Sequence, residues 1–161
     1  MTYQNAKPWR KNKTSRSTQH TAQSKCRGTL KPLLSDDAKS TSNIQELSYD
    51  FACRITRLYQ YLTEDSQYKE YIISKQVFRS GTSIAANIAE AQYAQSKADF
   101  LAKMSIASKE SNETAFWLNL LHDNGYLNDV AYNSIYTDCL RVRNKIRAIT
   151  KSTKESIQQK K

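Results

Sequence analysis

The chain has 161 residues and a formal net charge of +10, and apolar residues make up 39% of it. Three glycines and two prolines are too few for an all-β fold, which needs turn residues about every 8–12 positions, or for a doubly wound α/β fold with its glycine-rich loop. No run approaches the roughly 18 consecutive apolar residues of a membrane span, so we expect an all-α protein without a membrane partner.

The positive charge is concentrated at the two ends of the sequence. Residues 1–40 hold nine basic and two acidic side chains, residues 41–138 hold eight and twelve, and residues 139–161 hold eight and one. Residues 1–40 also lack apolar periodicity, which predicts a disordered basic tail. Basic ends of this kind fit either a phosphate-bearing partner, such as nucleic acid or lipid headgroups, or solvated tails that keep the protein soluble.

Apolar stripes at helical spacing begin after this tail. From Ile44 to Leu62 six apolar residues recur at spacings of three and four, which predicts a first helix over 43–62. A second helical pattern runs over 67–92 and is rich in small residues. Gly81 lies inside it, at a cost of about 1 kcal/mol relative to alanine, so we expect a neighbouring backbone to approach closely there.

Capping residues delimit two further helices. Ser96, followed three residues later by an aspartate, starts the third, and Gly125 follows its end. Asn128 and Asp129 are favourable N-cap residues for the fourth. Its apolar residues recur from Tyr132 to Ile149 at spacings of three and four, a heptad seam. Four amphipathic helices with short connections predict an up-down-up-down four-helix bundle over 43–150, followed by a basic C-terminal tail over 151–161.

Two segments carry a family resemblance. The first reads RSGTSIAANIAEA from Arg79 to Ala91, and the second comprises SKADFLAK at 96–103 and SNETAFWLNLL at 111–121. They resemble the linked motifs of a bacterial family of four-helix bundle proteins, first noticed as reading frames within intervening sequences of 23S ribosomal RNA genes. The resemblance covers about residues 44–150 and departs at Ala85, where the family usually has Gly or Pro. It implies a helical bundle with no established enzymatic activity.

That family is similar in fold to the accessory variability protein of diversity-generating retroelements. This relative assembles as a pentamer with a basic surface, and it works with a reverse transcriptase and its RNA. The resemblance therefore implies a closed homo-oligomer, with a pentamer as the precedent. It also implies RNA or DNA as a partner, and a reverse transcriptase or another protein as a further one.

Four polar residues of the first motif share one stripe of the second helix. Arg79, Ser83, Asn87 and Glu90 stand at i, i+4, i+8 and i+11. They fit either a ligand site or an internal Arg–Asn–Glu network that fixes helix register or a subunit contact. The structural interpretation is favoured, because no histidine, cysteine or second close carboxylate supplies acid–base chemistry.

The sequence predicts neither catalysis nor a bound cofactor or metal. The three cysteines and two histidines are far apart and form no CxxC pair, so they predict no zinc site, disulfide framework or nucleophile–base pair. Glu110 and Glu113 lie one turn apart beside Lys109, an arrangement more typical of a solvated, salt-bridged face. Widely spaced thiols favour a reducing cytosol, so we expect a cytoplasmic protein that is not an enzyme.

A row of cations on the fourth helix is the candidate phosphate-binding surface. Arg143, Arg147, Lys151 and Lys154 follow one another at i, i+4, i+8 and i+11, with Arg141 and Lys145 beside them. They lie off the apolar seam, so we expect them to face outward and contact phosphates. The alternative is that they are solvated cations near a helix C-terminus.

Five tyrosines cluster about the first two helices, namely Tyr59, Tyr61, Tyr68, Tyr71 and Tyr93. Because the basic charge is concentrated elsewhere, these tyrosines are more typical of a subunit interface than of base stacking. The leading hypothesis is a non-enzymatic, oligomeric accessory protein that binds RNA or DNA. The alternative is a structural or protein-interaction module whose homo-oligomer docks another protein.

Overall fold

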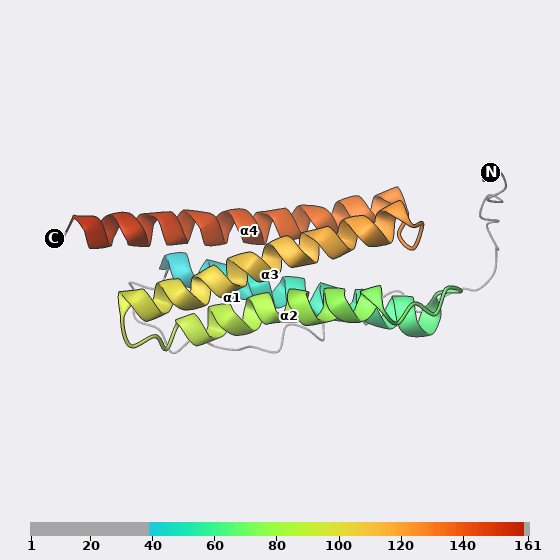
Figure 1. The fold of residues 1–161 in the computed structure, drawn as a ribbon, viewed down its shortest axis with the longest axis horizontal. Coiled ribbons are helices and arrows are strands. Elements are labelled where there is room, and N and C mark those ends of the chain that lie inside the picture. Colours follow the sequence, from blue (N-terminus) through green and yellow to red (C-terminus); the bar gives the residue numbers. More distant parts are fainter. Residues whose placement is uncertain (1–38, 160–161) are drawn as a thin grey trace. The chain divides into compact units, whose positions relative to one another are not determined.

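A computed structural model describes residues 39–159, with side chains from residue 44 onward. Within this part the chain forms four α-helices and no strand (Figure 1). The elements are α1 Lys39–Gln60, the π-helical turn η2 Tyr61–Asp65, α2 Ile73–Ala91, α3 Lys97–Asp123 and α4 Asp129–Gln158. The predicted all-α four-helix bundle is therefore confirmed, whereas the predicted basic tail over 1–40 falls almost entirely outside the described residues.

Consecutive helices run up and down and pack on their sequence neighbours. The contact between α2 and α3 is the most extensive, α1 packs on α2 and α4 on α3, and α1 meets α4 less closely. Residues 61–72 join α1 to α2, and residues 124–128 join α3 to α4 at the same end of the bundle, which we call the connection end (Figure 1). None of these four helices is long and apolar enough to cross a bilayer.

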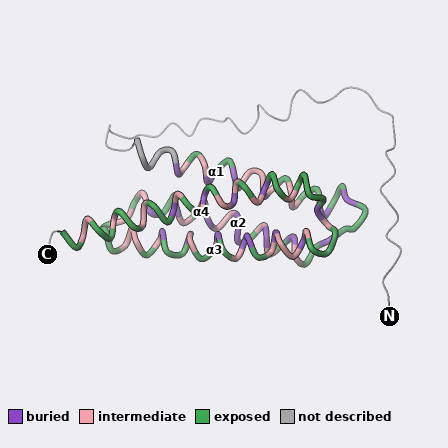
Figure 2. Tube along the Cα trace, turned by 90° about the horizontal axis from the view of Figure 1, so that it is seen from above, coloured by how far each residue is buried: buried purple, intermediate pink, exposed green. Residues whose placement is uncertain are grey.

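The apolar stripes of the four helices form the core. Figure 2 shows buried positions recurring at intervals along all four helices. The seam predicted on α4 is confirmed, because Ile135, Cys139, Val142 and Ile146 are all buried. The largest fully buried side chains are Ile44, Phe51, Ile55, Leu62, Val77, Ile84, Ile88, Met104, Leu118, Leu121, Val142 and Ile146.

Gly81 of α2 packs closely against Ile55 of α1. A β-carbon at this position would lie 2.8 Å from the Cγ1 atom of Ile55, closer than unstrained carbon atoms pack. The expected close approach is confirmed, but the neighbour is an α1 side chain of the same chain rather than a backbone. Gly81 therefore allows α1 and α2 to pack closely within the bundle.

The start of α2 corrects the sequence prediction. The pattern placed it at Gln67, but the helix begins at Ile73, and Lys69 in the preceding connection has a positive φ of 47°. The Glu70 carboxylate accepts hydrogen bonds from the backbone N–H groups of Ile72 and Ile73, at 2.9 and 2.8 Å. These bonds satisfy donors that a helix N-terminus leaves unpaired, so they fix the start of the helix.

The predicted caps of α3 and α4 are confirmed. The Ser96 hydroxyl accepts from the backbone N–H of Asp99 at 3.1 Å, and the Asn128 side chain accepts from that of Ala131 at 2.9 Å. Gly125 has a φ of +77°, the left-handed conformation that glycine adopts just after a helix. Local sequence signals thus determine the turn between these helices.

The outer ends of the bundle extend beyond the predicted limits of 43 and 150. Helix α1 begins at Lys39 and α4 continues to Gln158, so most of the predicted basic C-terminal tail over 151–161 is helical. Residues 151–158 contain neither glycine nor proline, and an established helix propagates readily through lysine, glutamate and glutamine. The predicted end at 150 followed the apolar seam of α4, which stops before the helix does.

Candidate nucleic-acid interface

The six candidate phosphate-binding residues lie on α4, beside its buried seam. Four of them are exposed, namely Arg141, Arg147, Lys151 and Lys154, and the other two, Arg143 and Lys145, are half-buried. The outward placement predicted from the sequence therefore holds for four of the six side chains.

Arg141 is engaged with a carboxylate of its own helix. Its guanidinium lies 3.4 Å from Asp138, which also pairs with Arg54 of α1. Arg54 further donates to the Ser134 hydroxyl at 2.8 Å, so this cluster links α1 to α4. The charge of Arg141 is partly compensated, which makes it a weaker phosphate ligand than an unpaired cation.

Arg143 corrects the expectation of a uniformly outward row. Its Nε atom is buried and has no hydrogen-bond partner among the described residues. Burial raises the pKa of the Cys139 thiol, one turn earlier, to about 12, and the charge of Arg143 opposes this with a smaller lowering effect. The long aliphatic stem of an arginine can cover apolar surface beside a seam, which accounts for the half-buried position.

Hydrogen bonds fix the antiparallel register of α3 and α4. The Tyr132 hydroxyl donates to the Asn119 side chain at 2.7 Å, and the Cys139 thiol donates to the Ser111 carbonyl at 3.5 Å. Further along, the Lys97 ammonium donates to the Ser156 hydroxyl. This register places the first half of α3 opposite the basic half of α4.

A shallow surface hollow of about 450 Å³ lies between these two halves, and we call it the α3–α4 hollow. It is lined by Ser105 and Ser108 of α3 and by Arg147, Thr150, Lys151, Lys154 and Glu155 of α4. Three of the six candidate cations therefore meet at one place, together with two serines that the sequence did not single out. Lys151 lies 4.0 Å from Glu155, whereas Arg147 and Lys154 have no ion-pair partner within residues 44–159.

The lining chemistry suits an anion. Guanidinium, ammonium and hydroxyl groups donate hydrogen bonds to oxyanions, and the guanidinium and ammonium groups also carry positive charge. Among the described residues no group of three or more histidines, cysteines or acidic side chains could hold a metal ion.

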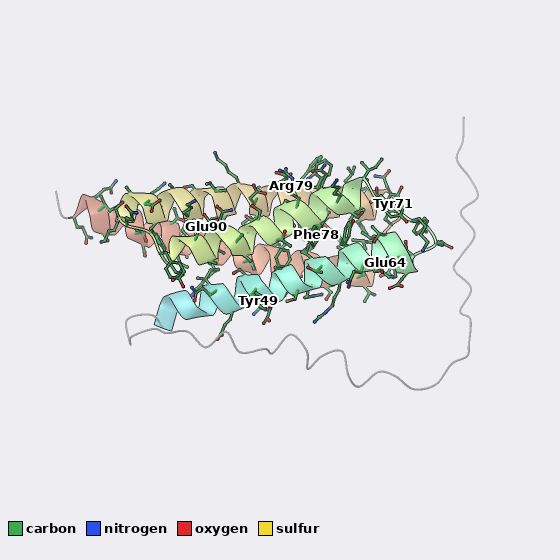
Figure 3. All side chains as sticks on the ribbon, turned by 90° about the horizontal axis from the view of Figure 1, so that it is seen from below. Tyr49, Glu64, Tyr71, Phe78, Arg79 and Glu90 are labelled. Carbon is green, nitrogen blue, oxygen red and sulfur yellow. The ribbon has the colours of Figure 1, made fainter. Side chains whose placement is uncertain are left out.

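The polar stripe of the first motif makes two separate contacts with α3. Arg79 lies 3.1 Å from Glu113, whose same oxygen accepts from the Trp117 indole N–H at 3.2 Å. Glu90 lies 2.5 Å from Lys103, and this hydrogen bond raises the pKa of the lysine. Figure 3 shows Arg79 and Glu90 well apart along α2.

Asn87 does not join these two pairs. Its side-chain amide donates to the Ser83 carbonyl at 2.9 Å and to the Ser83 hydroxyl at 3.2 Å, both within α2. The interpretation of one continuous Arg–Asn–Glu network is thus replaced by two ion pairs that bridge α2 and α3. Because the two ion pairs lie at different positions along the α2–α3 contact, together they fix the register of these two helices.

Exposed apolar side chains gather at the connection end. We call this group the connection-end patch; it comprises Tyr61, Tyr68, Tyr71, Ile72 and Val130, which are 49–81% exposed. Tyr61 and Val130 line one hollow between α1 and α4, and the Tyr68 ring meets that of Tyr126 edge-on at 5.3 Å. Figure 3 shows Tyr71 at the same end as Glu64.

The predicted tyrosine cluster is therefore split. Tyr59 is half-buried, with its ring 5.0 Å from that of Phe78, and so belongs to the α1–α2 packing. Tyr93 is 88% exposed but follows α2, at the opposite end of the bundle. The connection-end patch keeps the other three tyrosines and adds Ile72 and Val130.

Comparisons with known proteins agree with the fold. A family model described as "23S rRNA-intervening sequence protein" matches residues 40–148. Among solved structures, a protein with unknown function from the S23 ribosomal protein family of Bacteroides thetaiotaomicron VPI-5482 is 44% identical. That match covers 70% of this chain and 98% of the other, with a TM-score of 0.67. No curated protein matches the sequence.

Proposed function

Because the chain belongs to the 23S rRNA-intervening sequence protein family, we propose that it is a non-enzymatic accessory protein that binds RNA or DNA through α4. The observation that carries this proposal is the meeting of Arg147, Lys151 and Lys154 in one exposed hollow. Three cations on one side of a helix can contact successive phosphates, and such contacts supply most of the affinity in sequence-independent binding.

The spacing and the charge balance support this proposal. From Arg147 to Lys154 the helix rises about 10 Å. Residues 139–161 carry eight basic side chains and one acidic one, so the field of this half of α4 attracts polyanions. Hydroxyl and cation contacts to phosphate carry no base information, so we expect weak sequence preference.

Titration of the full chain tests the proposal directly. Labelled single-stranded RNA and duplex DNA are each titrated at low salt, and binding is followed by fluorescence anisotropy. Saturable binding to either one supports the proposal, and the stronger of the two identifies the preferred nucleic acid. No binding to either at low salt would contradict it and leave the protein-interaction function.

The second candidate function is assembly and protein docking, and the connection-end patch favours it. Exposed aromatic and aliphatic side chains at one end of a bundle are typical of protein contacts. We infer that this patch contributes to a homo-oligomer, for which the pentameric accessory variability protein is the precedent. A reverse transcriptase or another protein would then dock on the assembled form. The mass of the full chain in solution tests this inference.

A further inference from the structure

Two hydroxyl donors of the α3–α4 hollow are used by no group in the part of the chain that the structure describes. The hydroxyls of Ser105 and Ser108 take part in no side-chain hydrogen bond within residues 44–159, and both line the hollow. By contrast, the third hydroxyl of the lining, that of Thr150, donates to the Ile146 carbonyl at 2.8 Å. Two serines one turn apart on α3 thus offer unused donors opposite the cations of α4.

The charge of the hollow is matched to a dianion. Its lining contains three cations, Arg147, Lys151 and Lys154, and one carboxylate, Glu155. Glu155 lies 4.0 Å from Lys151 and offsets one positive charge. A phosphate monoester carries about −1.5 to −2 at neutral pH and presents three strong acceptor oxygens. A phosphodiester inside a strand carries a single negative charge, so it matches this lining less well.

We propose that the α3–α4 hollow binds the terminal phosphomonoester of a nucleic-acid strand. Ser105 and Ser108 donate to the oxygens of this terminal phosphate from α3, and Arg147, Lys151 and Lys154 of α4 contact it and the next phosphates of the strand. The inference rests on the proposed function, and it assigns a preferred point of attachment: a phosphorylated strand end rather than any position along the backbone.

The test compares short RNAs of identical sequence that end in a 5′-phosphate, a 3′-phosphate or hydroxyls only, each labelled at an internal position. We expect the full chain to bind one phosphorylated form about fivefold more tightly than the hydroxyl-ended form, the effect of about one net hydrogen bond from the serine hydroxyls to the terminal phosphate. The double variant Ser105→Ala, Ser108→Ala should lose this preference and keep its affinity for the hydroxyl-ended RNA.

Ser152→Ala is the matched control, because Ser152 is an exposed serine of α4 that does not line the hollow; it should keep the preference. Equal affinity for all three RNAs would overturn the inference while leaving the proposed function standing. Loss of the preference in Ser152→Ala as well would also overturn it. Binding to none of the three RNAs would reject both.

A competition experiment distinguishes binding of a strand end from binding of a free phosphate compound. Inorganic phosphate and a nucleoside monophosphate are added to the complex with the phosphorylated RNA. We expect both to compete far more weakly than the unlabelled phosphorylated RNA, because they lack the neighbouring backbone contacts. Competition by inorganic phosphate at the same concentration as the RNA would overturn the assignment of a strand end.

Discussion

Glu70 and Ser74 bond each other twice at the start of α2. The Glu70 carboxylate accepts from the backbone N–H of Ser74 at 2.6 Å, and the Ser74 hydroxyl donates to the Glu70 carbonyl at 2.6 Å. Both residues are buried, although Glu70 lies in the connection before the helix. The pair therefore anchors the α1–α2 connection to the first turn of α2.

Glu70→Gln should destabilise the fold and flatten its response to acid. Burial raises the pKa of Glu70, but hydrogen bonds from Ile73, Ser74 and Ile72 together outweigh it, so the pKa lies below the ordinary value of 4.5. The stabilisation is present above that ordinary value and is lost as pH falls through the lower pKa of the folded state. We expect a loss of about 1–2 kcal/mol at neutral pH, measured by urea unfolding.

Glu64→Gln is the control for this variant, because Glu64 is an exposed acid of the same connection end. Its unfolding free energy should follow that of the parent chain across the acid range. If Glu70→Gln kept the acid sensitivity of the parent chain, the carboxylate would not be the group that holds the start of α2.

Gly81→Ala should destabilise the bundle through its contact with Ile55. A β-carbon at 81 would lie 2.8 Å from Ile55 Cγ1 and 2.9 Å from Cγ2, and overpacking of this kind costs about 1–3 kcal/mol. A double-mutant cycle isolates the cause. In an Ile55→Ala background the same change should be neutral or stabilising, because the clash is gone and alanine is the better helix former. An equal cost in both backgrounds would contradict this account.

Cys139 should resist thiol reagents in the folded protein. Its side chain is fully buried, and burial raises its pKa to about 12, so almost no thiolate is present at about pH 8. Mass mapping after brief alkylation should find Cys139 unmodified without denaturant and modified in urea. Rapid modification of Cys139 under native conditions would mean that the α3–α4 contact opens readily.

The connection-end patch should control assembly. Val130→Glu adds a charge to the patch at the start of α4, where an acidic residue suits the helix dipole and spares the fold. We expect a lower mass than the parent chain by light scattering at equal concentration. Tyr93→Glu is the control, because Tyr93 is equally exposed at the other end of the bundle and should leave the mass unchanged. A parent chain that is already monomeric would exclude this role.

Apolar spacing and capping residues predicted most of the fold. The heptad seam of α4 and the caps at Ser96 and Asn128 are short-range signals, and the structure bears them out. The sequence predicted too early a start for α2, because its helical pattern extends back to Gln67. In the structure the Glu70 carboxylate accepts hydrogen bonds from the first backbone N–H groups of the helix, so the helix begins after Glu70. A glutamate four residues before Ser74 does not match the usual capping motifs, so the sequence alone does not reveal this contact.

The candidate site was predicted less completely. The sequence identified Arg147, Lys151 and Lys154, since charge spacing on one helix can be read directly. Ser105 and Ser108 were missed because their role depends on the register between α3 and α4, which long-range contacts determine. The short turn at Gly125 offered a clue: in antiparallel helices joined by a short turn, residues equally distant from it lie opposite one another.

The salt dependence of binding is the most direct test of phosphate contacts at α4. Each neutralised phosphate of a single strand steepens the fall of log affinity with log salt by about 0.7, so three hollow cations should contribute a slope of about −2. Replacing Arg147, Lys151 and Lys154 by glutamine should flatten the slope by that amount. A charge-matched variant, Lys69→Gln, Lys75→Gln, Lys109→Gln, should keep the slope of the parent chain. Equal slopes for the hollow variant and the parent chain would contradict phosphate binding at α4.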